Sequence, residues 1–282
     1  MKWEQHIRKH MADLTIYSGD NLPILRQMES DSIDLIYIDP PFNTGKAQRY
    51  KRTKTIRDEQ GDRVGFQGER YRTVALGERS YQDRFGDFGA FIRPRIKEAH
   101  RLLKPTGSLF FHLDWREIHR CRVLIDEMFG SHCLLNQLIW AYDFGGRSKK
   151  KWSTKHDTIL WYAKNPGSHC FNAEIAHAIA NIPPGGTEIE GFLGDAWWHT
   201  IVPTNGPERT GYPTQKPLGI LKRIIAVHSQ PGDIVLDFFA GSGTTGDAAL
   251  QLGRNAILID KNPDAIEVIE SRIPHKAIRK EQ

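Results

Sequence analysis

The residues best suited to chemistry in this chain form a short loop that directly follows an apolar run. They are Asp39, Pro40, Pro41 and Phe42. Two consecutive prolines fix the backbone and remove two amide donors, which leaves the loop carbonyls as acceptors. A carboxylate and a carbonyl can together accept both hydrogens of an exocyclic amine, and an aromatic ring can stack on a flat base. The motif therefore predicts a site for an amino-bearing base; the alternative is a proline-stiffened turn with a buried Phe.

A second motif begins 198 residues later, counted from Asp39 to Asp237 (237 − 39), and also follows an apolar run. Its glycines allow the backbone to approach a ligand closely. Its acidic residue could meet a cationic ammonium group. The spacing with Gly246 completes G-x-G-x-x-G, so glycine spacing alone leaves a dinucleotide open. The residues of this predicted cofactor loop are Asp237, Phe239, Gly241, Gly243, Thr244 and Thr245.

Asp260 ends the next apolar run, 23 residues after Asp237. A carboxylate at that place can hold both hydroxyls of a ribose. The alternative is that Asp260 caps a helix that begins at Pro263.

These loops need a sheet to position them. Short apolar runs predict strands, and apolar residues at helical spacing predict helices between them. We expect an α/β fold with a Rossmann-like, doubly wound and mostly parallel sheet, in which ligands collect outside the carboxyl ends of the strands. The predicted strands are 14–17, 33–38, 109–113, 138–142, 158–162, 234–236 and 256–259, and the main predicted helices are 91–103, 118–129 and 218–225.

Two segments depart from this pattern. Residues 43–80 contain ten Lys or Arg and five Asp or Glu, with no clear period, and we predict a mobile basic loop there. Residues 164–210 are rich in Pro, Gly, Asn and His, which predicts a small inserted module. Aromatic and hydrogen-bonding side chains in that module could read bases, although the two tryptophans could equally belong to the core: Trp197, Trp198, His199, Asn205 and Arg209.

The order of these motifs resembles the DNA amino-methyltransferases of the permuted β group, which use S-adenosylmethionine (SAM). The resemblance extends from about residue 13 to 272. It implies the SAM-dependent methyltransferase fold, with a catalytic domain over 13–163 and 211–274 and a target-recognition module over 164–210. Three further segments support it: Gly19-Asp20-Asn21, His112-Leu113-Asp114-Trp115-Arg116 and Tyr212-Pro213-Thr214-Gln215-Lys216-Pro217.

The resemblance implies a role for each motif. Asp39 and the Pro40 carbonyl would orient the target amine, and Phe42, which stands where many relatives have Tyr, would stack on the flipped base. Asp39 favours adenine N6, because relatives that modify cytosine N4 more often carry Ser there; cytosine N4 is the first alternative. No metal is implied. SAM would be held by Asp20, Lys216, Asp237, Phe239, Gly241, Gly243, Thr244, Thr245 and Asp260.

The formal charge of +5 and the pI near 9.0 suit a polyanionic partner, although a solvated basic surface is the alternative. We expect double-stranded DNA, with phosphates gripped by the 43–80 segment and by a second basic loop. The candidate DNA-binding residues are Lys46, Arg49, Lys51, Arg52, Arg147, Lys149, Lys150 and Lys151.

Other functions remain as alternatives. They are methylation of RNA or of a protein amide, a non-catalytic DNA-binding subunit, and a nicotinamide-dependent oxidoreductase. Three cysteines without CxxC spacing fit reduced thiols, and we see neither a secretory signal nor a membrane span. We therefore expect a cytoplasmic, nucleoid-associated protein of prokaryotic type. A homodimer and a cognate restriction endonuclease are further partners that the family resemblance allows.

Overall fold

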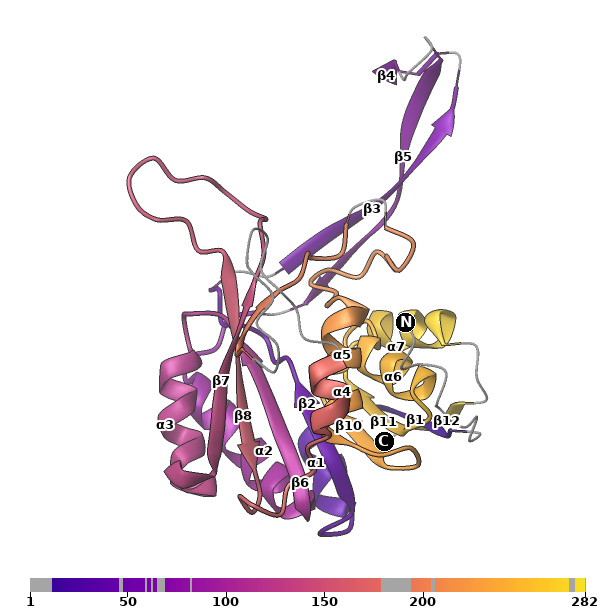
Figure 1. The fold of residues 1–282 in the computed structure, drawn as a ribbon. Coiled ribbons are helices and arrows are strands. Elements are labelled where there is room, and N and C mark those ends of the chain that lie inside the picture. Colours follow the sequence, from indigo (N-terminus) through magenta and orange to yellow (C-terminus); the bar gives the residue numbers. More distant parts are fainter. Residues whose placement is uncertain are drawn as a thin grey trace.

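The computed structural model describes residues 12–45, 48–58, 60–61, 63–64, 69–81, 83–178, 194–203, 206–273 and 277–281 (Figure 1). Its framework is a nine-stranded sheet in the order β12-β1-β11-β10-β2-β6-β8-β7-β9. All its strands run in one direction except β8, which is antiparallel to β6 and β7. The strands are β1 (Leu14–Ser18), β2 (Ile33–Ile38), β6 (Leu103–Leu113), β7 (Leu134–Ala141), β8 (His156–Ala163), β9 (Ala196–Trp198), β10 (Ile234–Asp237), β11 (Asn255–Asp260) and β12 (Ala277–Glu281).

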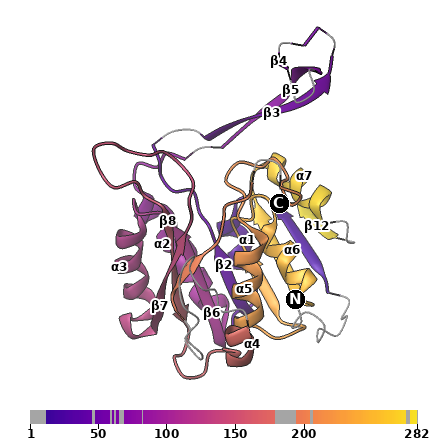
Figure 2. The same ribbon diagram turned by 45° about the horizontal axis from the view of Figure 1, so that its top comes forward.

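Helices cover both faces of the sheet, as the doubly wound prediction required (Figure 2). One face packs against three helices, and the opposite face packs against three others. A short helix, α4 (Ala173–Ala178), lies beside α5. The first layer is α1 (Asn21–Gln27), α2 (Phe88–Leu102) and α3 (Ile118–Phe129), and the second is α5 (Leu218–His228), α6 (Thr244–Gln251) and α7 (Pro263–Arg272).

The central strand β2 shows why its sequence is almost entirely apolar. Successive side chains of a strand point to opposite faces. Ile36 and Ile38 pack with the α1–α3 layer, whereas Leu35 and Tyr37 pack with the α5–α7 layer. A strand buried on both faces needs apolar residues at every position, and this need produces the continuous run that identified the strand.

The strand directions bring the two predicted motifs to one edge of the sheet. β10 lies between β2 and β11 and is parallel to both, so Asp39, Asp237 and Asp260 all follow or end strands at the same edge. The reversed strand β8 begins at this edge too, because Thr158 is paired with Leu113 at the end of β6. The loop between β7 and β8 therefore also emerges there.

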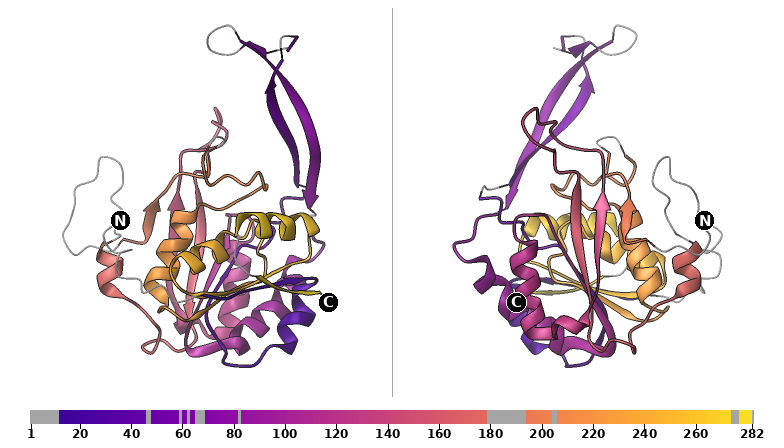
Figure 3. Two further views of the ribbon diagram at one scale, coloured as in Figure 1. Left: turned by 90° about the vertical axis from the view of Figure 1, so that its right-hand side faces the viewer. Right: turned by 60° about the vertical axis from the view of Figure 1, so that its left-hand side comes forward.

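The prediction that residues 43–80 form a loop was wrong. They contain a three-stranded antiparallel sheet, in which β3 (Gln48–Arg57) and β5 (Arg70–Tyr81) form a long hairpin and β4 (Arg63–Val64) pairs with β5. The hairpin projects away from the body of the protein (Figure 3). Strands that lie outside the main sheet do not need the apolar alternation of a core-facing strand, and only the Thr, Tyr and Val content of this segment indicated strands.

The segment 164–210 is irregular in its described part, apart from α4 and β9. β9 adds an edge to the main sheet by pairing with β7, with Trp197 opposite Trp140. Its boundaries as a module stay a prediction. Asn205 lies outside the described residues. In the described part of the chain, no helix is long and apolar enough to cross a membrane.

Candidate active site

A cavity of about 270 Å³ lies where the ends of β1, β2, β10 and β11 meet. It brings together both predicted motifs, although they are almost 200 residues apart in sequence. Twelve of the predicted catalytic and cofactor residues line it: Asp20, Asp39, Pro40, Pro41, Phe42, Lys216, Asp237, Phe239, Gly241, Thr244, Thr245 and Asp260.

Gly243 is the predicted cofactor residue that is absent from the described lining. Its φ of +72° is the left-handed conformation that favours glycine, and it caps the start of α6. A Cβ at Gly243 would lie 2.8 Å from Ile269 in the core, not in the cavity. A Cβ at Gly241 would instead lie 3.2 Å from Tyr212, which lines the cavity. Gly241 is therefore the glycine whose missing side chain keeps the cavity open.

Asp237 forms the floor of the cavity at the end of β10. Its carboxylate accepts hydrogen bonds from the Phe239 amide at 2.9 Å and from the Thr245 hydroxyl at 2.6 Å. Burial raises the pKa of Asp237 to about 7, against these two hydrogen bonds. A cationic ligand group beside this carboxylate would be stabilised, because it would replace part of the lost hydration.

Asp260 accepts hydrogen bonds from the Gly241 amide at 2.8 Å and the Asn262 amide at 2.9 Å. Burial raises the pKa of this carboxyl. The residue that caps α7 is Asn262, whose side chain accepts from the Asp264 amide, so the alternative in which Asp260 caps that helix is wrong. Asp260 instead holds the glycine loop against the end of β11.

Arg95 anchors Asp20 at the other end of the cavity. Its guanidinium donates to Asp20 at 3.0 Å and to the Asn21 side chain at 2.6 Å. Asn21 in turn donates to the Phe238 carbonyl at 2.6 Å. Sequence reasoning missed Arg95, for which the signal was an arginine at a core-facing position of a predicted helix, and it placed Asn21 in a family segment without giving its side chain a role.

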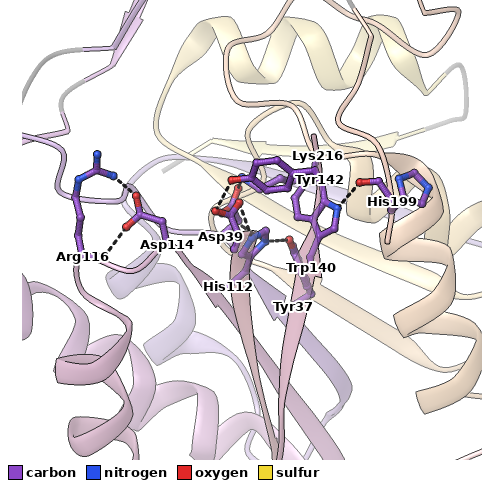
Figure 4. Close-up of polar contacts among 10 residues, drawn as sticks. Tyr37, Asp39, His112, Asp114, Arg116, Trp140, Tyr142, His199 and Lys216 are labelled. Atoms are coloured by element: carbon purple, nitrogen blue, oxygen red, sulfur yellow. Dashed lines mark hydrogen bonds and ion pairs between the residues drawn. The ribbon is translucent and has the colours of Figure 1, made fainter. Parts of the chain in front are cut away.

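Asp39 makes its shortest contact with a lysine (Figure 4). The ammonium of Lys216 lies 2.5 Å from Asp39 Oδ2 and 4.8 Å from the centre of the Phe42 ring. The sequence predicted Lys216 near the cofactor, and the structure places it on the target-base motif as well. Lys216 therefore stands at the junction between the two halves of the cavity.

A chain of buried polar side chains lies behind Asp39. His112 Nδ1 lies 3.8 Å from Asp39 Oδ1 and 2.7 Å from the Tyr37 hydroxyl, and its Nε2 lies 3.3 Å from Asp157. The Tyr142 hydroxyl donates to Asp157 at 3.0 Å. Burial alone would raise the pKa of Asp157, but the hydrogen bond and charge of His112 lower it. Sequence reasoning assigned no role to these residues, although a histidine within the apolar run 109–113 was a signal.

The basic residues predicted to bind DNA fall on two projecting segments (Figure 1). Arg49, Lys51 and Arg52 belong to β3, and Lys46 lies outside the described residues. The other four lie in the loop between β7 and β8 and are exposed: Arg147, Lys149, Lys150 and Lys151. The Ser148 hydroxyl accepts from the amides of Lys150 and Lys151, which gives this loop an internal turn.

The cavity suits a cationic, nucleoside-like cofactor. Five carboxylates line it, those of Asp20, Asp39, Asp83, Asp237 and Asp260, and burial raises the pKa values of Asp237 and Asp260. SAM carries a sulfonium, an ammonium and a ribose, which are groups that such carboxylates can hold. The fold and this site define a SAM-dependent methyltransferase.

Comparison with known proteins gives the family. A family model for DNA methylases of the N6/N4 class matches residues 33–271. The DNA adenine methyltransferase YhdJ of Escherichia coli K12 is 31% identical over 267 residues, which cover 90% of this chain and 80% of YhdJ. The type II methyltransferase M.HpaI of Haemophilus parainfluenzae is 26% identical over 93% of this chain and 74% of its own length. The chain belongs to the N6/N4 DNA methylase family, whose members transfer methyl groups from SAM to exocyclic amines of DNA.

Solved structures agree on the fold. The complex of M1.HpyAVI with SAM is 21% identical to this chain, with a TM-score of 0.59 over 92% of this chain and 98% of that one. The cytosine-N4-specific PvuII DNA methyltransferase is 18% identical, with a TM-score of 0.65 over 95% of this chain and 90% of that one. Both N6 and N4 enzymes are thus represented among the proteins similar to this chain.

Proposed function

We propose that this protein methylates the N6 amine of adenine in double-stranded DNA, at a specific sequence. The observation that carries this proposal is the placement of Asp39 and Phe42 on the wall of the cavity that Asp237 and Asp260 also line. Adenine is favoured over cytosine by an aspartate, not a serine, at the head of the motif. A relative at 31% identity, YhdJ, is named as an adenine methyltransferase, which supports the same target.

In this mechanism Asp39 accepts one hydrogen of the target amine, and the Pro40 carbonyl accepts the other. These contacts turn the nitrogen lone pair toward the cofactor end of the cavity. Phe42 stacks on the face of the extruded base, which contributes roughly 1–3 kcal/mol. The buried chain of His112, Tyr37 and Asp157 lies behind the Asp39 carboxylate, with His112 Nδ1 3.8 Å from Asp39 Oδ1. Positioning is the main catalytic device, because direct transfer needs aligned reacting atoms.

The cofactor end of the cavity is assigned to SAM, which supplies the electrophilic methyl group. Asp237 would hold its ammonium, and Asp260 would hold the ribose hydroxyls. Phe239, Gly241 and Asp20 would form the walls around the nucleoside. Thr244 and Thr245 act through other residues, because their hydroxyls already bond the Lys216 carbonyl at 3.1 Å and Asp237 at 2.6 Å.

DNA would be gripped by the two projecting basic segments. Phosphate contacts from the β3–β5 hairpin and the β7–β8 loop would position the duplex without reading sequence. Reading of bases is assigned to the 164–210 module, in which Trp198 is 41% exposed and Trp197 packs against the core. Pairing with a restriction endonuclease follows by analogy from relatives named as type II methyltransferases. A homodimer and a cytoplasmic, nucleoid-associated location stay predictions.

The test is incubation of the protein with SAM and mixed-sequence genomic DNA, then nuclease digestion and mass spectrometry of the nucleosides. We expect N6-methyladenine. N4-methylcytosine would change the target and keep the site. Unmodified DNA from a protein that binds SAM would contradict the proposal and direct the search to RNA or a protein amide.

A further inference from the structure

The ammonium of Lys216 stands where the target amine has to bind. It contacts Asp39 Oδ2 at 2.5 Å and lies 4.8 Å from the centre of the Phe42 ring. The other oxygen, Oδ1, is buried and has no hydrogen-bond partner within the described part of the chain. Oδ2 is therefore the oxygen that the cavity presents, and the lysine holds it.

An amine and an ammonium cannot occupy the same position between Asp39 Oδ2 and the Phe42 ring, because each would fill the space that the other needs. A base that stacked on Phe42 and donated to Asp39 would need the space that the ammonium fills. The side chains of Lys216 and Asp39 are only 11% and 16% exposed, so water weakens the ion pair little. The target base consequently requires the lysine side chain to leave.

The backbone of Lys216 is anchored, whereas its ammonium is held by its contacts with Asp39 and the Phe42 ring. Its carbonyl accepts a hydrogen bond from the Thr244 hydroxyl at 3.1 Å, and the adjacent Gln215 side chain bonds Thr210 and the Glu208 carbonyl. The long alkyl stem of a lysine allows its ammonium to reach several positions from one anchored backbone. The cavity continues from Lys216 past Thr214 and Tyr212 to the glycine loop, which is the part assigned to SAM.

We propose that Lys216 makes target binding depend on the cofactor. In the cofactor-free enzyme the ammonium holds Asp39, and in the loaded enzyme it pairs with the carboxylate of SAM, which leaves Asp39 for the target amine. This inference rests on the proposed function. It predicts positive coupling between cofactor and target DNA, and such coupling is reciprocal, so target DNA also tightens cofactor binding.

The test measures the affinity for a duplex that the wild type methylates, with and without the product cofactor S-adenosylhomocysteine. For the wild type we expect that this cofactor tightens DNA binding by at least about fivefold. Methylthioadenosine, which lacks the amino-acid end of the cofactor and with it both the carboxylate and the ammonium, should leave DNA affinity unchanged. Lys216→Met should bind the duplex without cofactor as tightly as the loaded wild type does, with no further gain from either cofactor.

Two variants control for charge and for folding. Lys216→Arg keeps a cation beside Asp39 and should keep the coupling. Lys261→Met removes another lysine of the cavity lining, one that makes no ion pair with Asp39, and should keep the coupling as well. If Lys216→Met no longer binds S-adenosylhomocysteine, its cofactor-free DNA affinity still decides the matter.

Coupling that survives in Lys216→Met would overturn the proposal. Weaker DNA binding by that variant without cofactor would also overturn it, because Lys216 would then be a contact to DNA. Absence of coupling in a wild type that methylates DNA would overturn this inference alone and leave the proposed function intact. Absence of any methylated base would instead contradict the proposed function.

Discussion

Asp39 lies between the Lys216 ammonium, which contacts it in the cavity at 2.5 Å, and the buried His112 ring behind it, at 3.8 Å. Asp39→Ala should lower methyl transfer by at least about a hundredfold, because small errors in placing a reacting group cost that much. Affinity for SAM should not fall, since Asp237 and Asp260 stay intact and Asp39 no longer competes with the cofactor for Lys216. Methyl incorporation into DNA and calorimetry with SAM measure the two effects.

Glu127→Ala, on the outer surface of α3, is the matched loss of a carboxylate and should behave as the wild type. Near-normal turnover by Asp39→Ala would remove this residue from the catalytic site.

Asp237 makes cofactor binding depend on pH. Burial raises its pKa to about 7, and only the ionised carboxylate attracts the cofactor ammonium. As pH falls below about 7, SAM affinity should fall and approach a loss of about tenfold per pH unit, because one proton must then leave. Calorimetric titrations between about pH 5.5 and 8.5 measure this dependence. A profile that is flat across that range would contradict an ammonium contact at Asp237.

The same shift affects stability with a defined sign. The pKa of Asp237 is higher in the folded than in the unfolded protein, so its contribution to stability is present at low pH and is lost as pH rises through about 7. Asp237→Asn removes this titration. Above pH 7 the variant should unfold at a higher temperature than the wild type, and near pH 5 this difference in unfolding temperature should be smaller. An equal difference at both pH values would argue against the buried charge.

The sequence predicted Asp39, Asp237 and Asp260 because each follows or ends an apolar run, which is a local signal; Asp20 came from the family resemblance, and Asp83, which also lines the cavity, was missed. It could not predict their supports, because those depend on contacts between distant segments. Arg95 and Asn21 are 74 positions apart and meet only when α2 packs beside α1. The contact between Lys216 and Asp39 could not be predicted either. A motif places a residue near one ligand and does not show which other side chains it meets.

At the scale of the elements, the loop between β7 and β8 presents its basic side chains to solvent at the edge where the cavity opens. Changing Lys149, Lys150 and Lys151 together to Ala should weaken binding to all duplexes alike, because phosphate contacts carry no sequence information. Each lost contact should lower the slope of log affinity against log salt by about 0.9. Fluorescence anisotropy at several salt concentrations measures both.

The double variant Lys97→Ala, Arg120→Ala removes exposed charges from the outer surfaces of α2 and α3 and should leave affinity and slope unchanged. If the triple variant keeps the wild-type slope, the loop is a solvated surface and not a phosphate clamp.

The core elements were predictable and the hairpin was not, for one physical reason. Strands such as β2 are buried on both faces, which gives a continuous apolar run. Helices such as α5 are buried on one face, which gives apolar residues at helical spacing. The β3–β5 hairpin projects from the body, and its strands are stabilised by pairing to each other, so no apolar period marks them. Its charge, by contrast, was readable directly from the sequence and still separates this segment from the rest of the chain.

For the molecule as a whole, the β3–β5 hairpin is an arm that can be removed, because the rest of the domain is complete without it. Its two ends are tied at Asp83, whose carboxylate accepts from the amides of Asn43 at 2.7 Å and Thr44 at 3.2 Å, while its carbonyl accepts from Gly45 at 3.0 Å. Asp83 is 1% exposed, so this junction belongs to the body. A short Gly-Ser linker can therefore replace residues 46–82 without straining the sheet.

That replacement should leave SAM affinity and thermal unfolding close to those of the wild type, since the cavity and both helix layers stay intact. It removes ten basic and five acidic residues, which equals the entire formal charge of +5. DNA affinity and its salt dependence should therefore drop together, and methylation with them. Full methylation by the shortened protein would show that the arm neither grips the duplex nor encloses the flipped base. Loss of SAM binding would instead place the arm within the folded core, against the Asp83 junction.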